Sequence, residues 1–426
     1  MKLMKNKNIY ENIAKTRVLN STISNSNSTI IYAENFKPGF FNSIPLWVKI
    51  AIFVYIVFSV IFAMFMYKRL KKHFIEKDSL LKEENEVQNT DDNLKVEIDS
   101  LENDYPEFRR NDKKYFSFFR VLLGALFFFW IKMITLIVVL ILVVVFLLLF
   151  SCFRVNNSPT KKTTCFQWVI SFTILSIFGF PVFLIFGLIS IYKKKRGENI
   201  KLIYEKYMGK YDDNNDKSYA CIISNHVGWI DIFYWCYKLA PGFIAKKELG
   251  NIPIFGQIMS NLNCLLVDRN DKQSRLKASE DLTTRIKMFY DKETYVPILI
   301  YPEGTVTNGE YLLPFKPGCF NALLPIKPLF IEIDDFNSPL AYIGFLNMID
   351  HFFYVSCFLY NYTNFYELPI IEYNEFMKKN HQLEGESDVD TYSRVANIIY
   401  RECFNLKESK KTYEDVRQFE DKINKY

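Results

Sequence analysis

Three long apolar runs mark the first half of the chain, whereas the second half alternates short apolar runs with charged stretches. The first long run covers residues 46–66 and has one charge, Lys49, near its start. Because a helix needs about 20 apolar residues to cross a bilayer, this run predicts a membrane helix. Two further runs cover residues 121–150 and 168–192.

The second and third runs are less regular than the first. Lys132 interrupts the second run, and a lysine at mid-bilayer costs roughly 2.5–3.5 kcal/mol. We therefore expect a span at 133–150, with 121–131 interfacial or re-entrant. The third run contains a glycine and a proline, which membrane helices tolerate where neighbours satisfy the backbone. Residues 119–196 are thus predicted as membrane helices or re-entrant segments; a buried core helix is the alternative for the second run and an in-plane segment for the third.

Charge around these runs predicts the orientation of the chain. Basic clusters stand at residues 68–72 and 193–196, and the positive-inside rule places both on the cytosolic side. Three spans place both clusters on the cytosolic side, with a lumenal N-terminus and everything after residue 196 in the cytosol. Residues 1–45, which are polar and rich in Asn and Ser, are predicted to be disordered. Residues 67–118 are expected to be a charged soluble linker.

After the third run the pattern becomes that of a soluble domain. Strand-like runs alternate with amphipathic helical stretches, which is typical of an α/β fold with parallel strand pairs. We expect a domain at residues 197–405 with a mixed sheet and flanking helices, preceded by membrane helices and followed by a charged, exposed tail at residues 406–426. Strands are expected at residues 218–223, 242–245, 263–267 and 296–301, and helices at 231–239, 273–290 and 388–404.

Composition excludes several classes of function. Lys and Arg number 53 and Asp and Glu 47, a net charge of +6, and the two signs are interleaved. That pattern does not indicate a nucleic-acid partner. The eight cysteines include no C-x-x-C pair and no metal-binding spacing with histidine, so neither a zinc site nor a disulfide framework is predicted. No metal is expected.

One of the four histidines stands where an apolar run ends. The sequence IISNHVGWID places His226 after a predicted strand and Asp231 five residues later. On one regular helix these side chains would not share a face, so they can meet only if His226 lies on the turn and Asp231 folds back from the helix start, with Gly228 supplying flexible backbone. A carboxylate beside imidazole fixes its tautomer and makes the other nitrogen a general base. The alternative is a surface histidine and an Asp that only caps the helix.

A second polar group follows the last predicted strand of the sheet. Glu303, Gly304 and Thr305 come directly after an apolar run, and ligands of open α/β sheets bind at the carboxyl ends of strands. Glu303 and Thr305 offer hydrogen bonds to hydroxyl or phosphate oxygens. An ordinary strand-to-loop turn is the alternative, since Pro and Gly mark turns generally.

Cations follow the other strands. Arg269 ends the run CLLVDRN and is suited to bidentate phosphate binding; a surface Arg–Asp pair is the alternative. Lys246 and Lys316 are further candidates for substrate binding, and each alone could be a solvated lysine.

Taken together, these motifs resemble a known family. NHVGWID, FIAKKELGNIPIFGQIM, VDRNDKQSR, YPEGTVTNG and LPIKPL occur in this order, and their spacing is similar to that of the glycerolipid acyltransferase superfamily. IPIFGQIM, DRNDKQSR and FKPGCFNALLPIKPL look most like its lysophosphatidylcholine/lysophosphatidylethanolamine acyltransferase branch. The resemblance covers roughly residues 200–405. That branch often continues into calcium-binding repeats, which do not follow here.

The resemblance implies transfer of an acyl chain from acyl-CoA, a co-substrate, to the free hydroxyl of a lysophospholipid, with no cofactor. His226 would deprotonate the hydroxyl and Asp231 would orient it. Arg269 and residues 303–305 would hold the glycerol-phosphate part. The bilayer would be the other partner, and the endoplasmic reticulum the expected location.

Two alternatives stay open. The first is a glycerol-3-phosphate or 1-acylglycerol-3-phosphate acyltransferase, with the same base and a different acceptor. The second is a catalytically inactive membrane scaffold; intact His226, Asp231 and Glu303 argue against it.

Overall fold

The computed structural model describes residues 44–74, 103–151, 162–213, 217–269, 271–333, 339–343 and 347–423. All but the last two residues of the expected disordered segment 1–45, and most of the expected linker between residues 67 and 118, lie outside these ranges. The chain divides into two compact units, Met1–Phe58 and Ser59–Tyr426.

Three described helices are long and apolar enough to cross a membrane: Leu46–Lys71, Phe118–Leu149 and Cys165–Leu184. The first belongs to α3 (Leu46–Phe74), which extends beyond the expected end at residue 66 into the basic cluster.

The helix over the second apolar run is continuous through Lys132. α5 (Phe118–Leu123), the π-helical turn η3 (Gly124–Phe128) and α6 (Phe129–Ser151) follow one another without a break. The side chain of Lys132 is buried, and its ammonium donates to the carbonyl of Phe358. The helix therefore continues through the lysine, whose ammonium is satisfied by a carbonyl distant in sequence; the start of the membrane span after Lys132 stays a prediction.

The third run changes from helix to strand near its end. α7 (Cys165–Ile185) is followed by β1 (Leu188–Lys194), which pairs in parallel with β8 (Asn361–Glu367). The domain therefore begins before the expected residue 197. α7 packs on α9 (Trp229–Leu239), where Ser176 Oγ donates to the carbonyl of Tyr237 at 3.0 Å.

The domain is built on a seven-stranded sheet with the order β1-β8-β7-β2-β5-β3-β4. β7 and β8 are antiparallel and all the other pairs are parallel, which confirms a mixed α/β sheet. The remaining strands are β2 (Cys221–Ser224), β3 (Gly242–Lys246), β4 (Leu265–Val267), β5 (Ile298–Ile300) and β7 (Ile326–Ile333).

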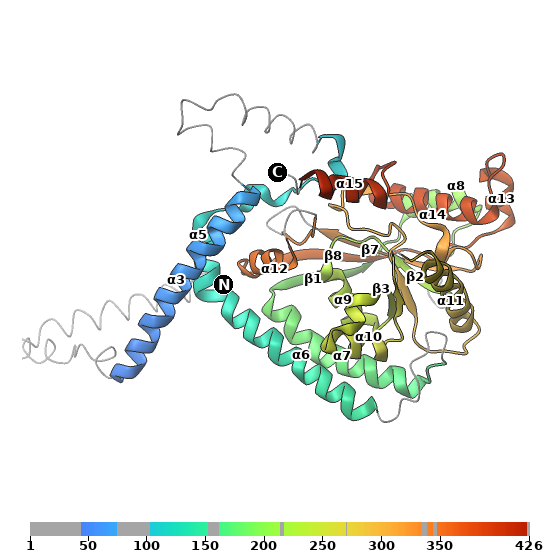
Figure 1. Cartoon of the computed structure of the whole chain (residues 1–426). Helices are drawn as coiled ribbons and strands as arrows, with labels where there is room; N and C mark the ends of the chain where they lie inside the picture. Colours follow the sequence, from blue (N-terminus) through green and yellow to red (C-terminus); the bar gives the residue numbers. More distant parts are fainter. Residues whose placement is uncertain are drawn as a thin grey trace, which may run out of the picture. The chain divides into compact units, whose positions relative to one another are not determined.

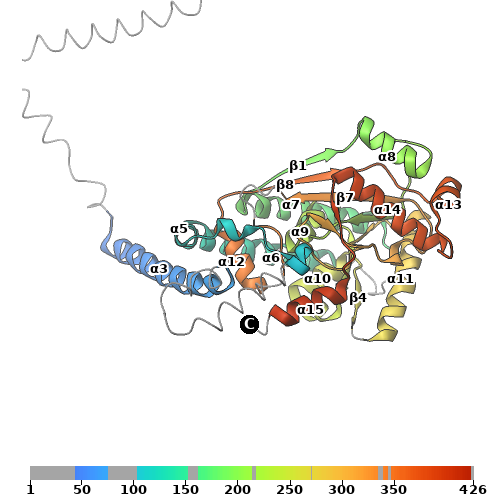
Figure 2. The same ribbon diagram turned by 90° about the horizontal axis from the view of Figure 1, so that it is seen from above.

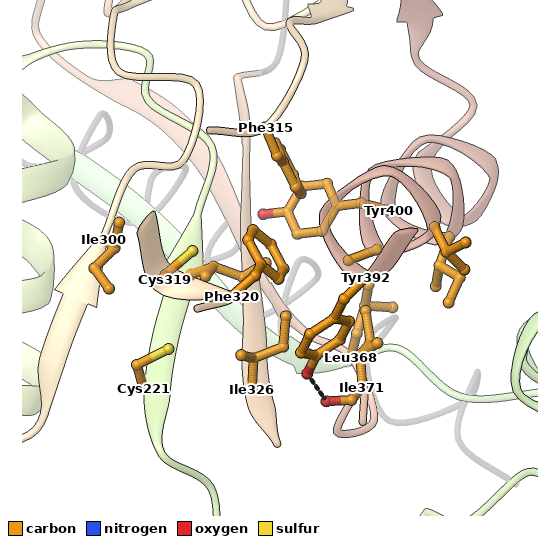
Figure 3. Packing of buried hydrophobic residues seen from close by; sticks show 14 of the residues in the cluster. Cys221, Ile300, Phe315, Cys319, Phe320, Ile326, Leu368, Ile371, Tyr392 and Tyr400 are labelled. Carbon is orange, nitrogen blue, oxygen red and sulfur yellow. Dashed lines mark hydrogen bonds between the residues drawn. The ribbon is translucent and has the colours of Figure 1, made fainter. Parts of the chain in front are cut away.

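Helices cover both faces of this sheet (Figure 1). Cys221 and Ile223 of β2 face a core formed with α8, α11 and α14, whereas Ile222 between them faces α7 and α9. This alternation follows from the two-residue period of a strand. In the first core, shown in Figure 3, the Tyr392 hydroxyl donates to the Ile371 carbonyl at 2.8 Å.

The further helices are α8 (Glu198–Met208), α10 (Pro253–Asn261), α11 (Lys272–Tyr290), α12 (Met348–Ser356), α13 (Glu375–His381) and α14 (Asp388–Phe404), with short 3-10 turns η1 (Pro106–Phe108), η2 (Asp112–Tyr115), η4 (Lys247–Asn251) and η5 (Pro317–Cys319).

The charged tail is folded, contrary to the expectation of an exposed segment. β9 (Lys407–Glu408) pairs with β6 (Tyr311–Leu312), and α15 (Tyr413–Ile423) follows. Val416 and Phe419 of α15 are buried, and the ring of Phe419 packs against Tyr105 and Phe108. The end of the expected linker and the tail therefore share one small core. Figure 2 gives a second view of these elements.

Candidate active site

The predicted site residues follow four neighbouring parallel strands. His226 comes after β2, the loop 302–305 after β5, and Arg269 after β4, while Lys246 is the last residue of β3. Because these strands are parallel neighbours in the sheet, their carboxyl ends lie along one edge, the usual binding edge of an open α/β sheet. The fold thus gathers motifs that are separated in sequence.

His226 and Asp231 are in direct contact. Nδ1 of His226 lies 2.8 Å from Oδ2 of Asp231. The same Oδ2 accepts the backbone N–H groups of Val227 at 2.9 Å and Gly228 at 3.2 Å, and Oδ1 accepts the hydroxyl of Tyr301 at 3.3 Å. Asp231 is completely buried, whereas the His226 side chain retains 19% of its exposure. The carboxylate is therefore fixed behind an accessible imidazole.

This arrangement selects the tautomer of His226. A carboxylate surrounded by donors acts as an acceptor, so Nδ1 of His226 bears the hydrogen that points at Asp231. Nε2 is then the unprotonated nitrogen, and no hydrogen bond to it is found within the described residues. The ring stacks on Tyr301 with centroids 4.0 Å apart, which fixes the plane of the imidazole. The geometry is that of a general base.

The alternative role of Asp231 as a helix cap is also realised. α9 begins at Trp229, and the Asp231 carboxylate accepts the N–H of Gly228 at the helix start. One side chain thus caps the helix and holds His226. The role predicted for Gly228 was wrong: its φ of 168° is ordinary extended backbone. Space is the requirement instead, because a Cβ there would lie 3.0 Å from the Leu340 carbonyl oxygen.

Glu303 lies behind the histidine rather than in the open site. It is 1% exposed, and its two carboxylate oxygens accept the backbone N–H groups of His226 at 3.3 Å and Leu313 at 3.0 Å. Burial raises the pKa of Glu303 to about 8, although both hydrogen bonds act in the opposite direction. In the structure the Glu303 carboxylate thus holds the backbone of His226; the expectation that Glu303 binds the acceptor stays a prediction.

The rest of this loop is shaped by Gly304. Its φ of +74° is in the left-handed region that favours glycine. A Cβ on Gly304 would also lie 2.5 Å from Nζ of Lys316, so Lys316 lies directly over the loop. Thr305 is buried beside it. The structure thus brings Lys316 to the loop 302–305, as the prediction of a shared site requires.

The other cations lie near the tail. Arg269 and Lys316 both face the ring of Tyr413 from α15, and the charge of Lys246 acts on Glu420 of the same helix. Sequence reasoning found the cations and missed both Tyr301 and Tyr413. Tyr301 could have been noticed as the residue that links strand β5 to the Pro302 loop, whereas nothing local distinguishes Tyr413.

Part of the chain that contains this site matches a known protein family. Residues 200–332 match the family described as Acyltransferase. They form an acyltransferase domain. The matched range contains His226, Asp231, Arg269 and the loop 302–305, whereas Tyr413 lies outside it.

Curated relatives of the acyltransferase domain have related names. The lysophospholipid acyltransferase LPEAT1 of Arabidopsis thaliana is 29% identical over 184 residues, 43% of this chain and 46% of that protein. The lysophosphatidylcholine acyltransferase of Drosophila melanogaster is 25% identical over 195 residues, 46% of this chain and 35% of that protein. The chain thus spans less than half the length of these relatives. The predicted superfamily is confirmed, and the relatives belong by name to the predicted branch.

Among solved structures, the 1-acyl-sn-glycerophosphate acyltransferase PlsC of Thermotoga maritima aligns with a TM-score of 0.40 and 16% identity, covering 65% of this chain and 95% of that one.

Proposed function

We propose that the protein is a membrane-bound acyl-CoA:lysophospholipid O-acyltransferase in which His226 is the general base. The observation on which this depends is the partly exposed imidazole of His226, with Nδ1 held by the buried carboxylate of Asp231. No cofactor is needed for this chemistry, because acyl-CoA is already an activated donor. The favoured acceptor is a lysophosphatidylcholine or lysophosphatidylethanolamine, the class named in the relatives.

The reaction needs one proton to be moved twice. Nε2 of His226 takes the proton of the acceptor hydroxyl as its oxygen attacks the thioester carbonyl. The new C–O bond forms, the C–S bond breaks, and the CoA thiolate leaves and recovers the proton from the imidazolium. Asp231 stabilises the imidazolium between these events. A positioned base of this kind contributes roughly 10²–10⁴-fold in rate.

The remaining site residues hold the substrates. Arg269, Lys246 and Lys316 supply the positive charge that a lipid phosphate requires, and Gly304 allows Lys316 to approach the loop closely. Glu303 positions the backbone of His226. Thr305 is proposed to contribute to the same acceptor site. The proposed function includes no nucleic-acid partner.

The location follows from the substrates and the charge pattern. Both substrates are amphiphiles, and three apolar helices would keep the site at the bilayer surface where these substrates dissolve. Basic clusters at 68–72 and 193–196 favour a cytosolic catalytic domain. We propose the endoplasmic reticulum as the organelle, the usual location of this chemistry.

The test is an acceptor panel. Microsomes containing the protein receive labelled acyl-CoA with lysophosphatidylcholine, lysophosphatidylethanolamine, lysophosphatidate or glycerol 3-phosphate, against microsomes without it. We expect label in the first two products at the highest rates. Label only in the products of the last two acceptors would favour the first alternative, and no label in any product would leave the inactive scaffold.

A further inference from the structure

The C-terminal helix α15 is anchored beside the candidate active site. β9 pairs with β6, which follows the loop 302–305 in sequence. Ser409 Oγ then donates to Oε1 of the buried Glu107 at 2.6 Å, and Phe419 is almost completely buried. These contacts give α15 a defined position relative to the loops at the carboxyl edge of the sheet.

The first residue of α15 faces two cations from other parts of the chain. The guanidinium carbon of Arg269 lies 5.6 Å from the centre of the Tyr413 ring, and Nζ of Lys316 lies 5.2 Å from it. Both distances are within the roughly 6 Å at which a cation is attracted to the electron-rich face of an aromatic ring. Arg269 follows β4 and Lys316 follows β6, so the ring of Tyr413 is shared by cations from two different parts of the chain.

Arg269 and Lys316 are like charges at one place and repel each other. Burial and the neighbouring Arg269 lower the pKa of Lys316, while Glu414 of α15 acts in the opposite direction. An aromatic face offsets part of this repulsion without neutralising either cation. The pair therefore keeps its charge available for an anion, next to Gly304 and the loop that braces His226.

We propose that Tyr413 is a positioning residue that holds Arg269 and Lys316 together as a two-cation clamp for the phosphate of the acceptor lipid. This inference rests on the proposed function. The phosphates of CoA have the same chemistry, and the test separates the two sources. The ring of Tyr413 is the operative feature, so its hydroxyl is dispensable.

The test compares two variants. Tyr413→Phe keeps the aromatic ring, whereas Tyr413→Leu removes the ring and keeps an apolar side chain. Each cation–π contact is worth about 0.5–2 kcal/mol, so we expect Tyr413→Leu to raise the KM for lysophospholipid roughly 3–30-fold with kcat within about 2-fold, and Tyr413→Phe to behave as wild type. Val416→Ala, which loosens the packing of α15 without touching either cation, is the matched control and should leave that KM near wild type. An unchanged KM in Tyr413→Leu, or a rise confined to the KM for acyl-CoA, overturns the proposal.

A binding readout separates this inference from the proposed function. Wild type and both variants are unfolded thermally with and without millimolar sn-glycerol 3-phosphate, the soluble part of the acceptor. We expect the ligand to stabilise wild type and Tyr413→Phe more than Tyr413→Leu, whether or not acyl transfer is detected. Equal stabilisation of all three proteins refutes the clamp. Absence of acyl transfer by the wild type refutes the proposed function instead.

Discussion

His226 and His351 show how differently the same side chain can be held in two places: one nitrogen of His226 is hydrogen-bonded, whereas both nitrogens of His351 are. His351 lies in α12 and is completely buried. Its Nδ1 accepts the indole N–H of Trp229 at 2.9 Å, and its Nε2 donates to the carbonyl of Pro339 at 2.9 Å. Both nitrogens of His351 are therefore engaged, whereas within the described residues no hydrogen bond to Nε2 of the partly exposed His226 is found.

The environments differ in charge as well as in access. His226 faces the buried carboxylate of Asp231. Burial, together with the charge of Arg110, lowers the pKa of His351 to about 3, so His351 stays neutral. What identifies a histidine as a candidate base is thus a carboxylate on one nitrogen and accessibility of the other, rather than burial alone.

The most severe test of this contrast is His226→Ala. We expect it to lower acyl transfer by roughly 10²–10⁴-fold, because the hydroxyl loses its proton acceptor. Initial rates with labelled acyl-CoA measure the effect, and membrane insertion should be unchanged. His381→Ala, which removes a half-buried histidine of α13, is the control. Retention of full activity by His226→Ala would refute the base assignment.

A smaller loss is expected for Asp231→Asn. The N–H groups of Val227 and Gly228 point at Oδ2 and should keep the amide oxygen of the new Asn toward His226. The tautomer of His226 then survives, and only the charge that stabilises the imidazolium is lost. We expect a decrease in kcat of roughly 5–30-fold, since charge-assisted hydrogen bonds exceed neutral ones by about 1–2 kcal/mol.

Asp231→Ala should be worse than Asp231→Asn, because it also leaves two buried N–H groups unpaired and frees the imidazole to rotate. If the two variants lost activity equally, the charge would matter more than the orientation.

Much of this site could be predicted because its parts are local. The end of each parallel strand marks a loop, and a sheet of neighbouring parallel strands brings those loops to one edge. His226 and Asp231 are close in sequence, so their contact required only a strand, a turn and a helix start. The helix at residues 388–404 was predicted with its observed limits, because its apolar period is strong.

The features that could not be predicted depend on distant partners. The Phe358 carbonyl that satisfies Lys132 is far away in sequence, as are the cations that meet Tyr413. Predicting that Glu303 holds the backbone of His226 would have required knowing that the N–H of Leu313 also binds the same carboxylate. The tail appeared exposed because Val416 and Phe419 are isolated apolar residues among charges, and their cover comes from residues 105–108.

The smallest expected effect is a change in stability, and it tests the assignment of His351 as a neutral, buried histidine. Gln at position 351 can replace the donor to Pro339 and leaves the N–H of Trp229 unpaired, which costs about 1–3 kcal/mol, or roughly 2–10 °C in Tm at pH 7.5 for a domain of this size. The folded pKa of about 3 is below the usual value, so native His351 resists protonation while the unfolded chain accepts it. The wild type must therefore lose stability as pH falls from about 6.5 toward 3. His351→Gln lacks this linkage, so the difference in Tm between the variant and the wild type should shrink on acidification. A difference that stays constant between pH 7.5 and pH 4.5 would contradict a neutral, buried His351.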